Sequence, residues 1–281
     1  MSLLFFLIGC DKEKKRNLDV DTSIDSLPDY FSLANNFNLS KSRREEFNKK
    51  AYAIVINQPN DSLNRVNLFK IANRYYNMDN LKKYKGTVKE VLKKSETSRD
   101  TANILKAFIY LGDYYSNEGV PDTAFMYYFK AEKLYLKNQD SYNVAKTRLS
   151  KALLKYNESD FLGSEIEVFK ALSSIKGKVA KDIVYESNNL LGVLYSQLED
   201  YNKALLYHTK ALSSIDAKVL PSVFQSKATS LNNLGFVYQN MNKHKQATIY
   251  FKQGLEQKDL ITDKPSYLQC YWTTWLFPNL N

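Results

Sequence analysis

Glycine and proline are scarce in this chain, whose 281 residues include only 9 Gly and 6 Pro, against 21 Tyr and 15 Phe. So few turn-forming residues disfavour an all-β fold with many tight turns and favour long helices with short connections. Hydrophobic residues make up 44% of the chain, which is enough to build a core. We therefore expect a folded, mainly helical protein.

Cysteine and catalytic motifs are also nearly absent. The two cysteines, Cys10 and Cys270, lie at opposite ends of the chain and cannot form a disulfide framework. The sequence contains no phosphate-binding loop, no HExxH or GxSxG motif and no paired-cysteine zinc spacing. No run reaches the ~20 apolar residues that would span a bilayer. We expect no enzymatic activity, no cofactor and no metal site.

The charge is strongly positive, with 40 basic and 30 acidic residues and a net charge of +10. One interpretation is a surface for nucleic acid or an anionic membrane, and the other is a lysine-rich helical surface exposed to water. The lysines are scattered and no arginine cluster accompanies them, which favours the second. A nucleic-acid-associated basic α-solenoid is the alternative function, and we expect no nucleic-acid partner.

The amino terminus begins with a short apolar run, Leu3 to Ile8, followed by Gly9 and Cys10. Leu-Ile-Gly-Cys resembles the bacterial lipobox, in which the cysteine is lipidated and acyl chains hold the protein at a membrane. We expect a truncated lipoprotein-type signal over 1–10, with lipidation at Cys10, and a polar tether over 11–39. The implied location is the cell envelope, lipid-anchored or periplasmic. The cytoplasm is the alternative, since the run is shorter than the usual ~7–15 residues.

A pattern recurs along the chain: Leu and a small residue, Tyr three residues later, a polar break, then Ala and a second small residue. The first small residue of each copy is Gly112, Ala152, Gly192 or Gly235, so the steps are 40, 40 and 43 residues. Weaker copies precede these. The second small residues follow the same steps: Ala131, Ala171, Ala211 and Gly254.

These residues resemble the tetratricopeptide repeat, whose hallmarks are a large apolar residue, Leu-Gly or Leu-Ala, Tyr, Ala, an aromatic residue and Ala. In one copy they are Phe108, Leu111, Gly112, Tyr115, Ala124, Tyr128 and Ala131. The resemblance implies an all-α fold, a right-handed α-solenoid of helix pairs with a 40–43-residue period over 40–260. The expected helices are 40–57, 61–77/80–95, 99–116/120–137, 141–156/160–176, 180–198/201–214 and 224–241/245–258. His208 takes a position that an aromatic residue usually fills, which favours packing over catalysis.

The resemblance also implies that the first helix of each pair lines a concave groove that binds a protein or peptide. Groove residues in the family lie three before, one after and four after the first small residue. Here they are Ile109, Asp113 and Ser116, then Leu149, Leu153 and Tyr156, then Asn189, Val193 and Ser196, then Asn232, Phe236 and Gln239. The lysine and arginine of the family's dicarboxylate clamp are missing, so a carboxy-terminal carboxylate is not the expected ligand.

Two amides in this set, Asn189 and Asn232, occupy the same repeat position. An amide can donate to and accept from an extended peptide backbone, which would make both of them ligand contacts. The alternative is that these amides only bridge neighbouring helices.

The carboxy-terminal end departs from the pattern, because 261–281 should begin the next repeat but instead contain both tryptophans and Cys270. Shifting the codon frame from about 268 restores a repeat-like reading, Leu-Asp-Asn-Leu-Ala-Phe, so we expect an out-of-frame tail. The whole array resembles the amino-terminal region of bacterial tetratricopeptide sensor histidine kinases. The resemblance implies the non-enzymatic sensing part of a bacterial signalling protein truncated by a frameshift. Its contact with a membrane would be only through a lipid anchor or a missing carboxy-terminal segment.

Overall fold

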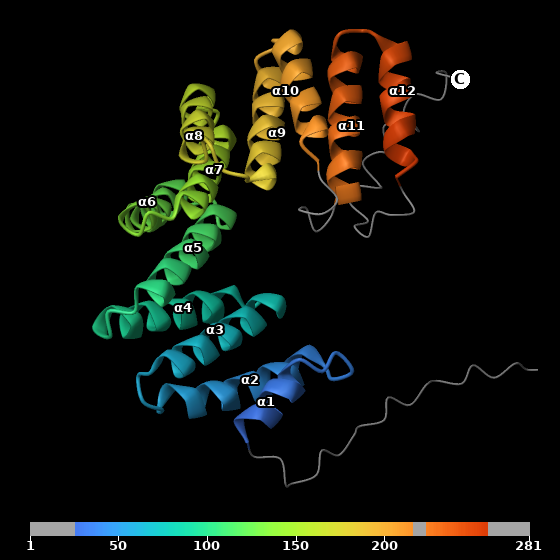
Figure 1. The fold of residues 1–281 in the computed structure, drawn as a ribbon. Coiled ribbons are helices and arrows are strands. Elements are labelled where there is room, and N and C mark those ends of the chain that lie inside the picture. The colour runs from blue at the N-terminus through green and yellow to red at the C-terminus, as the bar shows by residue number, and fades with distance from the viewer. Residues whose placement is uncertain (1–25, 216–222, 258–281) are drawn as a thin grey trace, which may run out of the picture. The chain divides into compact units, whose positions relative to one another are not determined.

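The computed structural model describes residues 26–215 and 223–257, and the regular structure within these ranges is entirely α-helical (Figure 1). The lipidation predicted at Cys10, the first part of the tether and the tail over 261–281 lie outside the described residues. The helices are α1 (Leu27–Ala34), α2 (Lys41–Ile56), α3 (Ser62–Asn77), α4 (Leu81–Thr97), α5 (Thr101–Asn117), α6 (Pro121–Lys137), α7 (Ser141–Asn157), α8 (Phe161–Ser174), α9 (Lys181–Gln197), α10 (Tyr201–Ser213), α11 (Val223–Asn240) and α12 (His244–Leu255).

The chain divides into two compact units within α4, Met1–Thr87 and Val88–Asn281. In the first unit, α1 packs on α2 and α2 packs on α3. The buried Asn48 of α2 donates a hydrogen bond from Nδ2 to the carbonyl oxygen of Ile71 at 3.1 Å, which ties α2 to α3.

Helix α1 lies within 11–39, which we expected to be a polar tether, so the tether does not extend over residues 27–34. Ser26 caps this helix by accepting a hydrogen bond from the backbone N–H of Asp29, and a proline occupies the first turn. The ring of Tyr30 stacks on Phe47 of α2 with centroids 6.2 Å apart. Because this ring is buried against α2, the segment is held as a helix.

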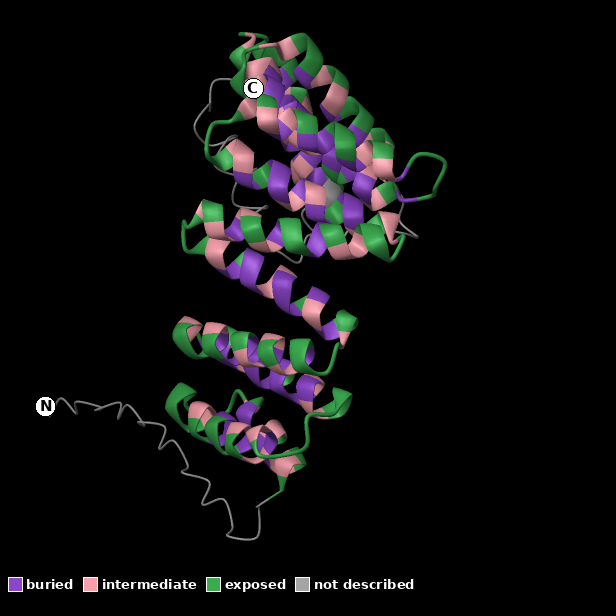
Figure 2. Cartoon of the chain, turned by 90° about the vertical axis from the view of Figure 1, so that its left-hand side faces the viewer, coloured by how far each residue is buried: buried purple, intermediate pink, exposed green. Residues whose placement is uncertain are grey.

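In the second unit the helices pack as consecutive pairs, α5 with α6, α7 with α8, α9 with α10 and α11 with α12. The second helix of each pair packs on the first helix of the next, and α9 also contacts both α7 and α11. The predicted all-α solenoid of helix pairs is confirmed. Figure 2 shows the buried positions lying on the faces that the helices turn to one another. Among the described residues, none of the helices has the length and apolar character needed to cross a bilayer.

The turns between helices reuse one device. A residue in the left-handed conformation ends one helix, and an aspartate then caps the next. Gln139 has φ 57°, and the side chain of Asp140 accepts a hydrogen bond from the backbone N–H of Asn143 at 3.1 Å. The same arrangement recurs at Arg99 and Asp100, Ser159 and Asp160, and Glu199 and Asp200. Each capping aspartate satisfies an N–H group that the helix itself leaves without a partner.

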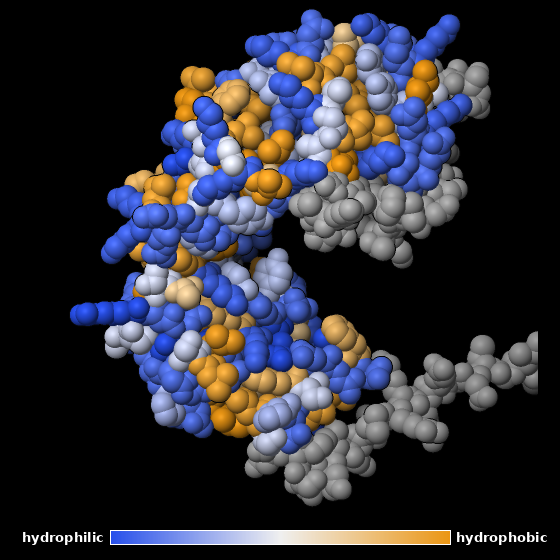
Figure 3. Space-filling view, in the orientation of Figure 1, coloured by the Kyte–Doolittle hydropathy of each residue, from blue (hydrophilic) through white to orange (hydrophobic). Residues whose placement is uncertain are grey.

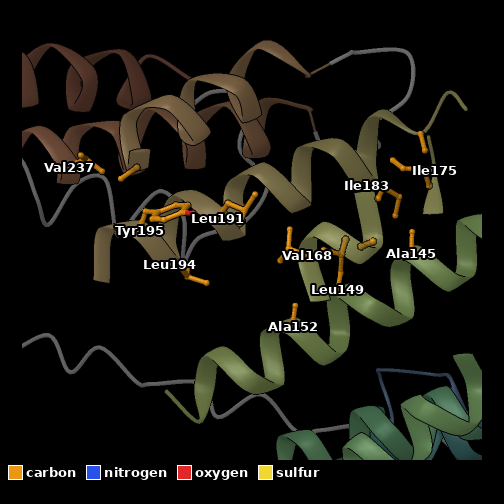
Figure 4. Close-up of a cluster of buried hydrophobic side chains, with 13 residues drawn as sticks. Ala145, Leu149, Ala152, Val168, Ile175, Ile183, Leu191, Leu194, Tyr195 and Val237 are labelled. Atoms are coloured by element: carbon orange, nitrogen blue, oxygen red, sulfur yellow. The ribbon is translucent and has the colours of Figure 1, made fainter. Parts of the chain in front are cut away.

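In three of the four pairs, the recurring Leu-Gly glycine of the first helix lies directly against a ring of the second helix. A Cβ atom at Gly112 would lie 2.5 Å from the ring of Tyr128, and the same distance separates such an atom at Gly192 from His208 and at Gly235 from Phe251. In the remaining pair, Ala152 and Val168 share the core cluster drawn in Figure 4. Where the first helix has a glycine, the facing residue of the second helix therefore carries a ring. Where the first helix has Ala152, the residue at the same repeat position of the second helix is the smaller Val168.

Candidate functional site

The described residues form a groove on the first helices of three successive pairs, α5, α7 and α9, which encloses about 640 Å³. It lies entirely within the second unit. Seven of the predicted binding residues line it: Ile109, Asp113, Leu149, Leu153, Tyr156, Asn189 and Val193. Their role in binding stays a prediction, but the structure brings these seven side chains together around one space.

Helix geometry explains why these residues share the groove. Positions three before, one after and four after the small residue follow the i, i+4, i+7 spacing of one helix face. The small residue lies about 40–100° around the helix from these positions and packs against the partner helix, as Gly192 does against His208. The groove face therefore lies beside the contact inside the pair, and Tyr128 of α6 reaches Asp113 there.

The groove has an apolar floor. Leu149 is 7% exposed, whereas Leu153, one turn further along α7, is 51% exposed. The ring of Tyr156 packs on Phe161 with centroids 5.8 Å apart, which holds it at the end of this row. Val193 of α9 continues the apolar lining on the neighbouring helix. A ligand side chain placed over Leu153 would remove apolar surface from water.

Asp113 is the carboxylate of the groove on α5. It accepts a hydrogen bond from the hydroxyl of Tyr128 at 2.7 Å. Burial raises the pKa of Asp113 above its usual range, and the hydrogen bond from Tyr128 only partly offsets this. At the same repeat position the next two first helices have Leu153 and Val193, so Asp113 is the polar member of that row.

Two further charged residues line the groove, and the sequence analysis missed both. They are Glu186 on α9 and Lys146 on α7. Burial raises the pKa of Glu186, the nearby Asp182 raises it further, and Lys146 opposes both. Glu186 lies six residues before Gly192, and Lys146 lies six residues before Ala152. Each is therefore one turn before the first predicted groove position of its helix, on the same face. Extending the family spacing by one turn would have found them.

Asn189 and Asn232, which we expected to face a peptide together from one repeat position, do not share the groove, because Asn189 lines it and Asn232 does not. Asn232 is 3% exposed, and Oδ1 of Asn189 instead accepts a hydrogen bond from Nδ2 of Asn233 at 2.9 Å. One residue along α11 turns the side chain by about 100°, which brings Asn233 rather than Asn232 to face α9. Asn189 therefore both lines the groove and bridges to α11.

The other predicted residues of α11 also lie outside this groove. Phe236 packs edge-on against Phe251 of α12 with ring centroids 5.4 Å apart. Gln239 is partly buried, and neither residue belongs to the groove lining. Ser196 donates a hydrogen bond to the carbonyl oxygen of Gly192 at 2.9 Å, within its own helix. The groove is thus built by α5, α7 and α9, with one side chain, Tyr135, from α6.

His208 has a structural environment. It is 1% exposed and packs against Gly192. Burial lowers the pKa of His208 to about 4, so the imidazole is neutral at neutral pH. Over residues 26–215 and 223–257, no group of three or more His, Cys, Asp and Glu side chains is placed to hold a metal ion.

Comparison with known proteins identifies the repeat. Residues 185–216 and 227–256 each match a family model described as tetratricopeptide repeat. No curated protein matches the sequence. Neither of the two matches is to an enzyme family.

Several solved structures have a similar fold. BtubC from P. vanneervenii has a TM-score of 0.63 at 20% identity, over 85% of this chain and 92% of that one. The apo form of RapI has a TM-score of 0.70 at 16% identity, over 90% and 68%. NprR in complex with its cognate peptide NprX has a TM-score of 0.59 at 10% identity, over 84% and 67%. At these identities the likeness concerns the fold alone. The regular structure of the described residues is all-helical, and the chain contains tetratricopeptide repeats at residues 185–216 and 227–256.

Proposed function

We propose that the groove on α5, α7 and α9 binds a linear peptide, either free or as a segment of a partner protein. The observation that carries the proposal is the lining itself: apolar residues, of which Leu153 is 51% exposed, beside amide and carboxylate groups around a space of about 640 Å³. Pockets of this size, mostly apolar with a few polar groups, are typical of ligand sites. The fold is also similar to that of NprR in complex with its cognate peptide NprX, which supports a peptide as the ligand class.

The charges of the groove favour a peptide over nucleic acid. Its lining includes two carboxylates, Asp113 and Glu186, and one lysine, Lys146. A phosphate backbone needs a row of cations, because counterion release supplies most of its affinity. Asn189 accepts from Asn233, which leaves its N–H groups as the donors that it can offer to a peptide carbonyl.

Panning a displayed random-peptide library on the purified chain tests the proposal. Enriched peptides would be synthesised and titrated by calorimetry against wild type and Leu153→Glu. A carboxylate in the apolar row should weaken binding at least about tenfold, because a ligand side chain would have to desolvate it.

Leu63→Glu provides the matched control. Leu63 is 66% exposed on α3, outside the groove. This change should leave affinity unaltered. Peptides that bind wild type and Leu153→Glu equally well, or a library that yields no enriched sequence, would overturn the proposal.

We further infer that the peptide-binding array is the sensing part of a bacterial signalling protein attached to the cell envelope through lipidated Cys10. The sequence Leu-Ile-Gly-Cys at residues 7–10 and the resemblance to sensor histidine kinases support this setting. Mass spectrometry of the mature amino terminus in the native host is the test, with a diacylglyceryl-modified Cys10 as the expected result. A free Cys10 thiol behind an intact Met1 would contradict it.

A further inference from the structure

The second helices of the pairs carry a row of exposed apolar side chains that the groove does not use. Met126 on α6, Ile166 on α8, Leu206 on α10 and Ile249 on α12 are 39%, 45%, 49% and 54% exposed. Their spacing of 40, 40 and 43 residues equals the steps of the repeat itself. These four residues therefore occupy one repeat position, unlike the isolated apolar residues found on most protein surfaces.

The helix geometry directs this row away from the core. Each member follows by two residues a buried small side chain, as Met126 follows Ala124 and Leu206 follows Ala204. Two residues correspond to about 200° around a helix, so the row lies opposite the face that packs on the partner helix. Phe129 and Phe169, three residues further along α6 and α8, widen it and are each 44% exposed.

Lysines border the apolar row in the same register. Lys130, Lys170 and Lys210 each lie four residues after the apolar position, one turn along the helix, and all three are exposed. Lys170 also contacts Glu167 at 2.9 Å. Lys133 stands over the ring of Phe129, with Nζ 4.5 Å from its centroid. We name these residues the outer stripe: Met126, Phe129, Lys130, Ile166, Phe169, Lys170, Leu206, Lys210 and Ile249.

The pattern is confined to the second unit. At the equivalent positions, α2 has Glu46 and α4 has Gly86. Figure 3 shows apolar patches breaking the hydrophilic surface at the left edge of the view, where Figure 1 places α6 and α8. An apolar surface bordered by lysines is the composition of helices that lie in a membrane interface, with lysines reaching phosphate groups and apolar side chains entering the acyl boundary.

We propose that the outer stripe docks the second unit on an anionic phospholipid surface. This inference is independent of the peptide groove, because it uses the second helices, whereas the groove is lined almost entirely by the first. Charge complementarity selects the occupant: the three stripe lysines favour an anionic surface. A nucleic acid would leave Met126, Ile166 and Phe169 without an apolar partner, whereas a lipid surface satisfies both halves of the stripe.

Co-sedimentation of the full chain with vesicles tests the proposal. Vesicles of phosphatidylcholine alone are compared with vesicles that contain 30% phosphatidylglycerol, at low and at physiological salt. Wild type should bind the anionic vesicles. Phe129→Ser with Phe169→Ser should weaken this binding about tenfold. Changing Lys130, Lys170 and Lys210 to Gln should weaken it about fivefold per lysine at low salt.

Two controls assign the effect to the stripe. Leu153→Ser alters an apolar residue of the groove that is 51% exposed, and it should leave vesicle binding unchanged. All variants share the same terminal residues, so any contribution of the termini cancels in the comparison. Circular dichroism checks that each variant keeps its helix content.

A site-specific readout keeps the test decisive if the termini bind vesicles strongly. In a chain with Cys10→Ser and Cys270→Ser, an environment-sensitive dye at Met126→Cys should shift to the blue on anionic vesicles, and one at Lys146→Cys in the groove should not. Equal shifts at both positions, or vesicle binding unaffected by the phenylalanine changes, would overturn the proposal. So would a dimer detected by light scattering that the phenylalanine changes abolish without any vesicle binding, since the stripe would then join two copies.

Discussion

At the scale of single residues, the mid-helix glycines are required because rings of the partner helices pack directly against them. A glycine inside a helix costs about 1 kcal/mol relative to alanine, so its recurrence needs a packing reason. The ring of Tyr128 fills the space where a Cβ atom of Gly112 would lie, at 2.5 Å. By contrast, a Cβ atom at Gly86 in α4 would have no neighbouring atom within 4 Å.

We predict opposite effects for the same substitution at these two glycines. Gly112→Ala should lower the free energy of unfolding by about 1–3 kcal/mol, because the Tyr128 ring has to shift. Gly86→Ala should raise it by up to about 1 kcal/mol through helix propensity. Urea titration followed by circular dichroism measures both. A stabilised Gly112→Ala variant would contradict the packing explanation.

His208 makes part of the stability depend on pH. Its pKa is about 4 in the folded chain and 6.5 for the unperturbed side chain, because burial disfavours the charged form. The unfolded chain binds the proton first as the pH falls, so this stability is complete above pH 6.5 and is lost progressively toward pH 4. The total loss is about 3 kcal/mol, from about 1.4 kcal/mol for each unit of pKa difference.

We predict that His208→Phe removes this component of acid sensitivity. Phe251 fills the equivalent space over Gly235, so the pair accepts a phenylalanine ring. Melting temperatures between pH 7.5 and 4.5 should fall less steeply for His208→Phe than for wild type. His244→Gln is the control, since His244 is exposed at the start of α12, and its pH profile should match wild type. Identical slopes for wild type and His208→Phe would contradict the assignment.

At the scale of helices, a buried ion cluster joins α6, α7 and α8. Lys151 of α7 lies 2.7 Å from Oε2 of Glu132 on α6 and 3.0 Å from Oε2 of Glu167 on α8. Arg148 binds the other oxygen of Glu132 at 2.7 Å. Burial alone would raise the pKa of Glu132, but the hydrogen bonds from Lys151 and Arg148 outweigh burial and lower it. The contribution of this lowered pKa to stability is present above pH 4.5, the pKa of the side chain in the unfolded chain. It is lost as the pH falls through the lower pKa that Glu132 has in the folded chain.

We predict that Lys151→Ala destabilises the chain by about 3 kcal/mol, because it leaves buried carboxylates short of a cation. Lys155→Ala, one turn further along α7, removes an ion pair with Asp160 whose side chains are 27% and 47% exposed. Such an exposed pair contributes less than about 1 kcal/mol. Chemical denaturation at neutral pH compares the two variants. Equal losses would show that the cluster is no more important than a surface pair.

At the scale of the whole molecule, each helix of the second unit contacts mainly its neighbours in the chain. Stability in such an array is approximately a sum of terms for single repeats and for the contacts between neighbours. Terminal helices can then open without the centre opening.

We predict that damage stays local when it is made in the last described pair. Phe251 is 2% exposed, and Phe251→Ala should cost about 3–5 kcal/mol by leaving a cavity between α11 and α12. Amide hydrogen exchange should then speed up in α11 and α12, while α5 to α8 keep their protection. Leu191→Ala, at a fully buried site in α9, should instead speed exchange on both sides of the change. A uniform increase after Phe251→Ala would show a single cooperative unit.

The sequence by itself determined the positions of the helices from α2 to α12, because the spacing of small and aromatic residues follows helix periodicity. The expected 180–198 became α9 over Lys181–Gln197, and the expected 99–116 became α5 over Thr101–Asn117. It also determined the groove face of α5, α7 and α9, since residues seven apart on a regular helix must share a side. Helix α1 was missed because it is short and precedes the repeats, although Ser26 and the proline after Leu27 signal its start.

Only the tertiary structure decided which side chains meet across helices. Asn189 reaches Asn233 rather than Asn232, because the 43-residue step before the last repeat gives no information about the rotation of α11. Lys151 forms ion pairs with Glu132 and Glu167 on two other helices, and no local sequence pattern predicts these pairs. The physical reason is that periodicity defines the direction of a side chain on its own helix, whereas the partner it meets depends on how neighbouring helices rotate and slide as they pack.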